Sequence, residues 1–323
     1  DDIPYEEDDM TYELLRDFAV AALSGRPVQI WGSGHQTVDL VRVDDLARML
    51  ADAMSKSLGR PIIVTNKPGA GTNIAAEYVA RSRDVGNIMF TADFATLAAN
   101  PTLFGKLNYN AEKDFAPVGL LVRFPMFLVA SNSVPANNLK EFSAWAKAQK
   151  ESVNWGSAGL GSPHHLVGEL FREKSGLPLM HVPYKGAAPG VQDVVGGQIP
   201  AMWLDSATAY PFINGQKLKA LAVASPKRLA VMPEVPTVAE QGVKGFEAYA
   251  WQGLVVPAGT PAETTHKLSE ALQSALGQTA IKARMQAMGL EPMPGTPAQM
   301  AAFAKAEREK WGGVITRIGV KLD

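Results

Sequence analysis

The chain has 323 residues, and at about 150 residues per domain this length predicts two domains. Hydrophobic residues make up 46% of it and charged residues 20%, which argues against a disordered, collagen-like or coiled-coil protein. The 31 basic and 32 acidic residues leave a formal charge of -1, so no overall field favours nucleic acid or an anionic membrane. The chain has no cysteine, which excludes disulfides and thiolate metal sites. Its longest apolar runs fall far short of the roughly 20 residues that a membrane span needs.

The first 23 residues are expected to form an N-terminal extension. They begin with an acidic stretch and lack the basic-then-apolar order of a secretory signal. An amphipathic helix is predicted at residues 11–23. From residue 24 onward, β-rich runs alternate with helical stretches, a pattern typical of βαβ units around a mainly parallel sheet.

Two such series are predicted, each forming one α/β lobe. The first has strands at 28–31, 62–65 and 88–91, followed by helices at 44–58, 73–82 and 94–104, respectively. The second has helices at 139–149, 163–174 and 188–195 and strands at 153–155, 180–183 and 201–204. Two long helices follow, at 261–276 and 297–318, with proline and threonine at their starts.

The two final helices have no third sheet to cover, so we expect them to return to the first lobe. The chain then crosses between the lobes twice, near residues 127–129 and 253–255. This assigns 1–23 to the extension, 24–126 plus 254–323 to lobe one, and 127–253 to lobe two. A paired crossing predicts a ligand cleft with a hinge between the lobes.

Three glycine-rich turns lie where a predicted strand gives way to a helix, at residues 66–73, 155–163 and 182–187. Glycine lets a ligand approach the backbone closely, and the free N–H groups of a helix start favour a carboxylate or phosphate. In the second turn, Ser162 suits an N-cap, Pro163 suits the first helical position, and Ser157 adds a hydroxyl. Every α/β protein needs such turns, so only their number around one cleft indicates an anion site.

Several long motifs follow one another in order: NKPGAGTNIAAEYVA, ANPTLFGKLNYNAEKDFAPVGLL, NWGSAGLGSPHHLVGELF, HVPYKGAAPGVQDVVGGQI and LKALAVASPKRLAVMPEVPTVAEQG. From about residue 45 to 323 the chain closely resembles the Bug-type periplasmic receptors of tripartite tricarboxylate transporters. The resemblance implies an α/β, two-lobed periplasmic binding fold of type II-like form. It also implies a monomeric periplasmic receptor, without catalytic activity, cofactor or metal, that closes on a small carboxylate and delivers it to membrane subunits of the transporter.

In that family the Ser-Ala-Gly-x-Gly-Ser turn holds the carboxylate, with help from the HVPYKG turn. The resemblance therefore assigns ligand binding in lobe two to Ser157, Ala158, Gly159, Gly161, Ser162, His164, Tyr184, Lys185, Gly186 and Asp205. In lobe one it assigns Gly69, Ala70, Gly71, Asn73, Asp93 and Thr96. Asp205 would meet the far end of the solute and suit an amine or hydroxyl there, or it would simply cap a helix.

The opening of the chain departs from the family pattern, which has a Pro-Gly-Gly turn and a Thr-Asp pair after the first strand. Here residues 11–47 resemble the late part of an extended short-chain sugar-nucleotide epimerase or dehydratase. Residues 32–35, Gly-Ser-Gly-His, either stand in for the missing turn or mark a fusion that damages the site. The sequence leaves both alternatives open.

An NAD-dependent epimerase or dehydratase is thus the alternative function. Such an enzyme needs a glycine fingerprint early in the chain and a later Tyr-x-x-x-Lys pair. Tyr109 and Lys113 have this spacing and residues 156–161 have suitable glycines, but they occur in the wrong order. His164 and His165 are adjacent and, about 100° apart on a helix, cannot easily share one metal ion.

Overall fold

The computed structural model describes residues 28–32, 43–67 and 70–322. Its strands are β1 (Val28–Gly32), β2 (Ile62–Val64), β3 (Ile88–Asp93), β4 (Phe115–Ser131), β5 (Val153–Ser157), β6 (Leu179–Pro183), β7 (Ala201–Asp205), β8 (Leu218–Val223), β9 (Tyr249–Pro257) and β10 (Glu291–Gly295). Its helices are α1 (Val43–Leu58), α2 (Asn73–Ala80), α3 (Asn100–Leu103), α4 (Leu139–Lys147), α5 (Pro163–Ser175), α6 (Ala187–Gly196), α7 (Ser206–Asn214), α8 (Ala262–Gly277), α9 (Thr279–Ala287) and α10 (Pro297–Ile318), with short helical turns η2 (Ala70–Thr72) and η3 (Ala95–Ala99).

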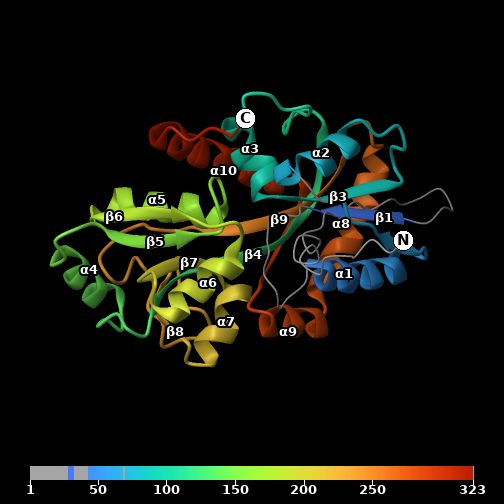
Figure 1. Ribbon diagram of the computed structural model, residues 1–323. Helices are drawn as coiled ribbons and strands as arrows, with labels where there is room; N and C mark the ends of the chain where they lie inside the picture. The colour runs from blue at the N-terminus through green and yellow to red at the C-terminus, as the bar shows by residue number, and fades with distance from the viewer. Residues whose placement is uncertain (1–27, 33–42, 68–69, 323) are drawn as a thin grey trace, which may run out of the picture.

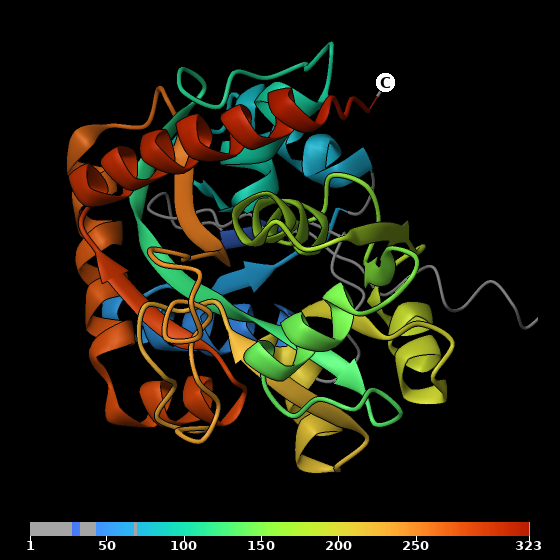
Figure 2. The same ribbon diagram turned by 90° about the vertical axis from the view of Figure 1, so that its left-hand side faces the viewer.

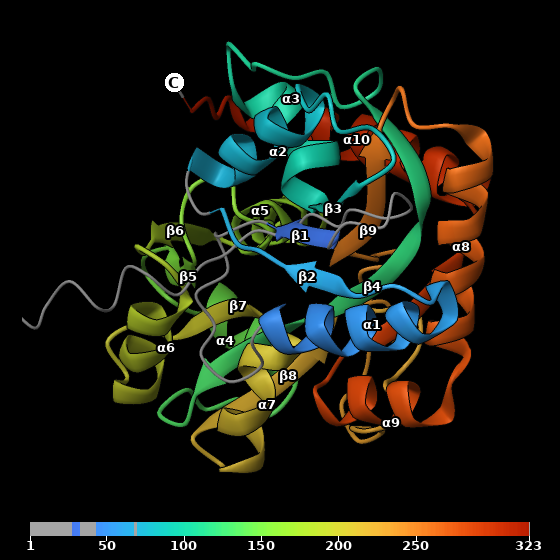
Figure 3. The ribbon, with the colours of Figure 1, turned by 90° about the vertical axis from the view of Figure 1, so that its right-hand side faces the viewer.

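The fold is two-lobed, with helices on both faces of each sheet (Figure 1). In the first lobe β1 pairs in parallel with β2 and β3, and β3 pairs antiparallel with β9. Figure 3 shows α2, α3 and α10 above these strands and α1 below them. In the second lobe β5 pairs in parallel with β6 and β7, while β7 and β8 pair antiparallel with β4. The expected alternation of strands and helices is confirmed in both lobes.

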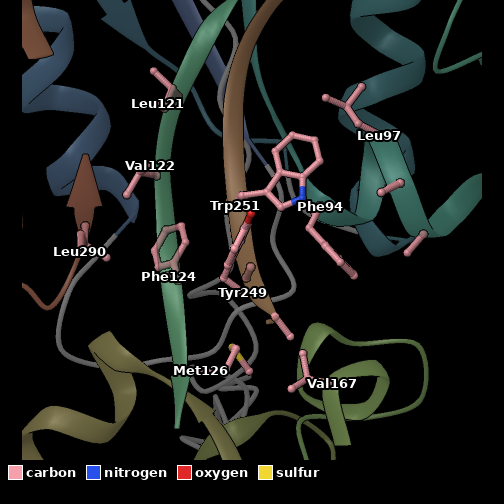
Figure 4. Packing of buried hydrophobic residues seen from close by; sticks show 14 of the residues in the cluster. Phe94, Leu97, Leu121, Val122, Phe124, Met126, Val167, Tyr249, Trp251 and Leu290 are labelled. Atoms are coloured by element: carbon pink, nitrogen blue, oxygen red, sulfur yellow. The ribbon is translucent and has the colours of Figure 1, made fainter. Parts of the chain in front are cut away.

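Strand β4 links the two lobes. It pairs with β9 up to Pro125 opposite Tyr249, and from Met126 onward it pairs with β7. This change of partner lies close to the first predicted crossing, near 127–129, which stays a prediction. Figure 4 shows Phe124 on β4 with Tyr249 and Trp251 on β9 in this region, and Met126 and Val167 toward the second lobe. These side chains are buried, so the linking strands are packed on both sides.

The second crossing precedes β9 instead of falling inside it. Ala248 donates its N–H to the carbonyl of Ala224 in the second lobe, at 2.9 Å, whereas β9 pairs with β4 along its whole length. The predicted crossing near 253–255 is thus displaced, because the apolar run that suggested it is a buried strand of the first sheet. The lobe boundaries stay a prediction. The pairing of β9 favours a return of the chain to the first lobe near residue 249.

Helix α10 returns to the first lobe, as its sequence indicated, and has the predicted bounds 297–318. A capping box formed by Thr296 and Gln299 fixes its start. Its buried Glu307 accepts hydrogen bonds from the indoles of Trp251 on β9, at 3.2 Å, and Trp311, at 2.8 Å. Farther along, Arg317 forms an ion pair with Glu173 of α5 at 2.9 Å. Figure 2 shows α10 crossing over the top of the molecule.

The predicted helix at 94–104 is helical from residue 94 to 103, but its first part is a π-helical turn, η3, which continues into the short α3. Pro101 lacks an N–H and cannot continue the normal helical hydrogen-bond pattern, which explains the change of register. Strands β8 and β10 and helix α9 were not predicted. The helix predicted at 11–23 and most of the 32–35 turn lie outside the described residues, as does Gly69.

Candidate functional site

The turn between β5 and α5 lies at the centre of the site that the sequence predicts in the second lobe. Ser162 caps α5, accepting the N–H of His165 at 3.2 Å, and Pro163 is the first helical residue. This cap and this proline confirm the local structure that the sequence predicted. Gly159 and Gly161 have φ values of 121° and 75°, a region that side chains other than glycine rarely adopt.

Several amides of this turn are already hydrogen-bonded within the lobe. Gly159 donates its N–H to Ser157 Oγ at 3.1 Å, and Gly161 donates to His165 Nδ1 at 3.1 Å. The amides of Ala158 and Leu160 have no acceptor within the part of the chain that the structure describes. They are therefore the backbone donors of this turn that an anion could use.

A stack of three rings lies against the turn on the interior side of the second lobe. The imidazoles of His165 and His181 are 4.1 Å apart and nearly parallel, and the indole of Trp155 lies 4.6 Å from His181. His181 Nε2 is 2.7 Å from Ser157 Oγ. Burial lowers the pKa of His165 to about 4, and burial together with the neighbouring His165 lowers the pKa of His181 to about 4. Both rings are therefore neutral near pH 7.

Asp205 and His164 form a second buried pair in this lobe. Asp205 caps α7, accepting the N–H of Thr208 at 3.1 Å, which confirms the capping alternative. His164 Nε2 lies 3.3 Å from Asp205 Oδ2. Burial alone would raise the pKa of Asp205, but hydrogen bonds from His164 and Thr208 outweigh it, so that the pKa lies below its ordinary value. This carboxylate is thus occupied within the lobe, and a role toward the far end of a solute stays a prediction.

The HVPYKG turn lies against the Ser157 turn. Tyr184 donates its N–H to the carbonyl of Ser157 at 3.1 Å, and Gly186 donates to the carbonyl of Ala158 at 3.2 Å. The Tyr184 hydroxyl donates to Asp193 at 2.7 Å. Burial and the Asp193 carboxylate raise the pKa of Tyr184 to about 12. The structure therefore brings the two predicted turns of lobe two together, with Lys185 exposed beside them.

In the first lobe, the turn entering α2 adopts left-handed backbone geometry at three successive residues. Ala70, Gly71 and Thr72 have φ values of 47°, 60° and 77°, and only glycine tolerates this region without cost. Asn100 holds the turn, donating to the carbonyl of Gly71 at 2.6 Å and to Asn73 Oδ1 at 2.8 Å. Such strain persists only where surrounding contacts impose it.

Asp93 and Thr96 brace the same turn. Asp93 Oδ1 accepts the N–H of Thr96 at 2.8 Å and its hydroxyl at 2.9 Å. Thr96 Oγ1 in turn lies 2.6 Å from Thr72 Oγ1. The predicted residues Asn73, Asp93 and Thr96 are thus assembled around one turn. Sequence reasoning missed Thr72 and Asn100, because their partners lie 24 and 29 residues away along the chain.

The two clusters approach each other at Gly161. A Cβ atom on Gly161 would lie 2.9 Å from Cδ1 of both Leu103 in α3 and Leu322 near the end of the chain. Leu322 also donates its N–H to the carbonyl of Leu103 at 2.8 Å. The turn of the second lobe therefore packs directly on the α3 segment, which begins with Asn100.

Other chemistry receives less support from the geometry. Tyr109 is buried and its hydroxyl donates to Asn73 Oδ1 and to the carbonyl of Thr96, both at 3.2 Å. Burial raises the pKa of Tyr109 above its usual range, whereas a Tyr-Lys pair works by lowering it. Within residues 28–32, 43–67 and 70–322, no group of three metal-binding side chains occurs, and no helix is both long and apolar enough to cross a bilayer.

Two cavities formed by described residues lie outside the predicted site. One, of about 220 Å³, is lined by residues that include Arg123, Tyr210 and Glu291. The other, of about 440 Å³, lies between the 104–112 loop and Arg308.

Comparison with known proteins decides the family. Residues 46–320 match the family described as "Tripartite tricarboxylate transporter family receptor". This chain belongs to that family of receptors. The expected resemblance over residues 45–323 is thereby confirmed, whereas the epimerase-like segment 11–47 falls almost wholly outside the match and stays a prediction.

Solved structures agree with the family and the fold. R. palustris Rpa4515 with adipate is 29% identical, with 88% of this chain and 96% of that chain covered and a TM-score of 0.78. The periplasmic binding protein BugD is 32% identical, with 93% and 99% covered and a TM-score of 0.76. MatC (Rpa3494) from Rhodopseudomonas palustris with bound malate is 33% identical, with 86% and 97% covered and a TM-score of 0.72.

Proposed function

We propose that this receptor works in the periplasm as a monomer, binds a small carboxylate and delivers it to the membrane subunits of a tripartite tricarboxylate transporter. The observation that carries the proposal is the placing of two turns, one from each lobe, against α3: Gly161 packs on Leu103, and Asn100 binds the carbonyl of Gly71. Support comes from the family and from two relatives whose structures contain dicarboxylates.

The anion would be held mainly at the start of α5. There the amides of Ala158 and Leu160 and the positive end of the helix dipole favour a negative group. Ser157 and His164 are fully buried, so they would contribute through the shape of the turn and of the helix start, while Ser162, Tyr184 and Lys185 complete the second-lobe side. Gly69, Ala70, Gly71, Asn73, Asp93 and Thr96 would supply the first-lobe side, and Asp205 would stay a supporting residue.

We also propose that the chain catalyses no reaction and needs no cofactor or metal. The alternative of an NAD-dependent epimerase or dehydratase is not favoured, because Tyr109 is engaged with Asn73 and Thr96 in the first lobe. A nicotinamide cofactor is therefore expected to leave the melting temperature unchanged.

The test is a thermal-shift and calorimetry screen of small mono- and dicarboxylates, with adipate and malate included, and of adipamide as the uncharged counterpart. A ligand at about 100 times its Kd stabilises the folded state by about 2.7 kcal/mol, which raises Tm by several degrees for a chain of this size. Adipamide should give no shift. If no carboxylate stabilises the protein but NAD does, the enzyme alternative replaces the receptor.

The site assignment is tested with the double variant Ser157→Ala/Gly159→Val. It should lower the affinity for the stabilising acid by at least about tenfold while the chain stays folded, because it disturbs the turn that presents the amides. Ser175→Ala/Gly176→Val is the matched control at the opposite, exposed end of α5, where Gly176 also has positive φ. Equal affinities of the two double variants would contradict the assignment.

A further inference from the structure

The turn that precedes α5 is shaped by two imidazoles that belong to no expected set of ligand-binding residues. His165 Nδ1 accepts the N–H of Gly161 at 3.1 Å. A neutral imidazole has one donor and one acceptor nitrogen, so His165 carries its proton on Nε2. Its acceptor role exists only while the ring is uncharged.

The Ser157 hydroxyl shows the same relationship with His181. Ser157 Oγ accepts the N–H of Gly159 at 3.1 Å, and its own proton can go to the Gly159 carbonyl at 3.2 Å or to His181 Nε2 at 2.7 Å. The Gly159 carbonyl already accepts the Ser162 hydroxyl at 2.7 Å. His181 Nε2 is closer to Ser157 Oγ than the Gly159 carbonyl is, and it accepts no other hydrogen bond in the described part of the chain. His181 is therefore the favoured acceptor and carries its own proton on Nδ1.

We propose that His165 and His181 are positioning residues of the solute site: as neutral acceptors they hold Gly161 and Ser157, and thereby aim the amides of Ala158 and Leu160 at the bound carboxylate. This inference rests on the proposed function and deepens it. The two rings lie face to face with centroids 4.1 Å apart, so a charge on one disfavours a charge on the other. Protonation of either ring removes one of the two bonds that fix the turn.

The charged surroundings of the pair come from α5. Glu169, one turn after His165, is the acidic group that faces His181, and it is engaged by Arg172 at 2.7 Å. Strand β5 contributes Trp155 and Ser157, which do not titrate in this range, and His164 is directed to Asp205. Burial lowers the pKa of His181 more than the Glu169 carboxylate raises it, and burial alone lowers the pKa of His165. Both rings are therefore neutral down to mildly acidic pH. A carboxylate solute would therefore be released as the turn loses its supports in acid.

The first test compares apolar and amide replacements, with adipate as the calorimetric probe. His165→Leu and His181→Phe keep volume but remove the acceptor, and each should weaken binding at pH 7 by about tenfold or more. His165→Asn and His181→Gln place an amide oxygen near the lost nitrogen and should stay within about threefold of wild type. His266→Gln, at an exposed site on α8, is the control and should bind like wild type.

A pH series separates a positioning role from a merely structural one. Between pH 7 and 4 the wild type should lose about threefold more affinity than the double variant His165→Asn/His181→Gln, because with both pKa values near 4 only about a third of the free chain keeps both rings neutral at pH 4. The ratio of the two affinities at each pH cancels the titration of the carboxylates of adipate itself. Parallel profiles, or apolar variants that bind like wild type, would overturn the proposal while leaving the receptor function intact.

A second set of measurements needs no solute. It therefore tests the roles of His165 and His181 even if the wild type binds none of the acids and the proposed function fails. Imidazole nitrogen NMR should show His165 protonated on Nε2 and His181 protonated on Nδ1 at pH 7. Hydrogen exchange should show the Gly161 amide protected in wild type and in His165→Asn. A Nε2–H tautomer of His181, or a Gly161 amide that exchanges like an exposed loop, would overturn the assignment even if His165→Leu does not fold.

Discussion

The turn before α5 and the turn before α2 both lead from a strand into a helix, but different groups hold them. In the second lobe, glycine occupies the positions with positive φ, and imidazole and hydroxyl groups bind the turn from inside. In the first lobe, Ala70 and Thr72 take positive φ themselves, and Asn100 and Thr96 hold them there. The second-lobe turn thus depends on backbone freedom, whereas the first-lobe turn depends on a polar network.

The difference predicts how each turn fails. A turn that relies on glycine should fail when a side chain is added, and one supported by neutral histidines should weaken in acid. A turn held by amide, hydroxyl and carboxylate groups should be insensitive to pH between 5 and 7 and should fail when a polar partner is removed. Three measurements distinguish failure by an added side chain, failure in acid and failure by loss of a polar partner.

The largest effect is expected for Gly161→Ala. A methyl group there meets Leu103 and Leu322 at 2.9 Å and forces a residue with φ near 75° to carry a Cβ. Left-handed strain costs about 1–2 kcal/mol and overpacking about 1–3 kcal/mol more. Urea unfolding should therefore show a loss of about 2–5 kcal/mol.

The control for this variant is Gly176→Ala, at the end of the same helix. Gly176 has φ of 62° and no neighbouring atom within 4 Å of the added Cβ, so only the strain of about 1–2 kcal/mol applies. Equal losses for the two variants would mean that the contact between Gly161 and the first lobe has no energetic weight. A larger loss at Gly161 would measure that contact by difference.

The next effect is the dependence of stability on pH that His165 confers. Its pKa is about 4 in the folded chain, against an ordinary value of 6.5 for the solvated side chain of an unfolded chain. Between these values the unfolded chain binds more protons, so acid favours unfolding. The stabilisation is fully present above about pH 6.5 and is lost as the pH falls toward 4. Because His165 is only 3% exposed, the free energy of unfolding should fall by about 3 kcal/mol over this range.

Urea unfolding at several pH values between 7 and 4 measures this loss. His165→Asn should flatten the curve, although His181 titrates in the same window and will leave part of the slope. Asp205 has a lowered pKa, so its contribution is lost only as the pH falls below its ordinary value of 3.8. A slope between pH 6.5 and 4 that is identical in wild type and His165→Asn would show that the ring is not buried as a neutral acceptor.

The sequence could predict what is local. The bounds of α10 follow from a proline, a capping box and helical periodicity within one segment, and the Ser162 cap and Pro163 follow in the same way. The parallel strands of both lobes could be recognised because each is followed by a helix. The family resemblance placed Ser157, Tyr184 and Asn73 in one site, and the structure brings their turns into two neighbouring clusters.

What could not be predicted depends on register and on distant partners. His181 meets Ser157 because Trp155 pairs with His181 in the parallel ladder, and no spacing in the chain reveals that register. The amides of Gly159 and Gly161, expected to be free for a ligand, are bonded by side chains that the fold places beneath them. The pairing of β9 could not be predicted for the same reason: β9 belongs to the first sheet because of its long-range pairing with β3 and β4.

The smallest of the three effects tests the polar network of the first lobe. Asn100→Ala leaves the carbonyl of Gly71 without its buried donor, since Asn100 is 2% exposed, and removes one of the two donors to Asn73 Oδ1, the other being the Tyr109 hydroxyl. Loss of a buried hydrogen-bond partner costs about 1–3 kcal/mol, and the strained residues on either side of Gly71 would then relax.

Urea unfolding of Asn100→Ala should show a loss of about 2 kcal/mol that is the same at pH 7 and pH 5, in contrast to the pH-dependent second-lobe turn. Asn108→Ala is the matched control, because Asn108 donates only to Glu77 at an exposed position, and its loss should stay within about 0.5 kcal/mol. Carboxylate affinity should fall further in Asn100→Ala than stability alone explains, since the left-handed turn is lost before the lobe unfolds. A variant with unchanged affinity would show that the first-lobe turn serves the fold and not the solute.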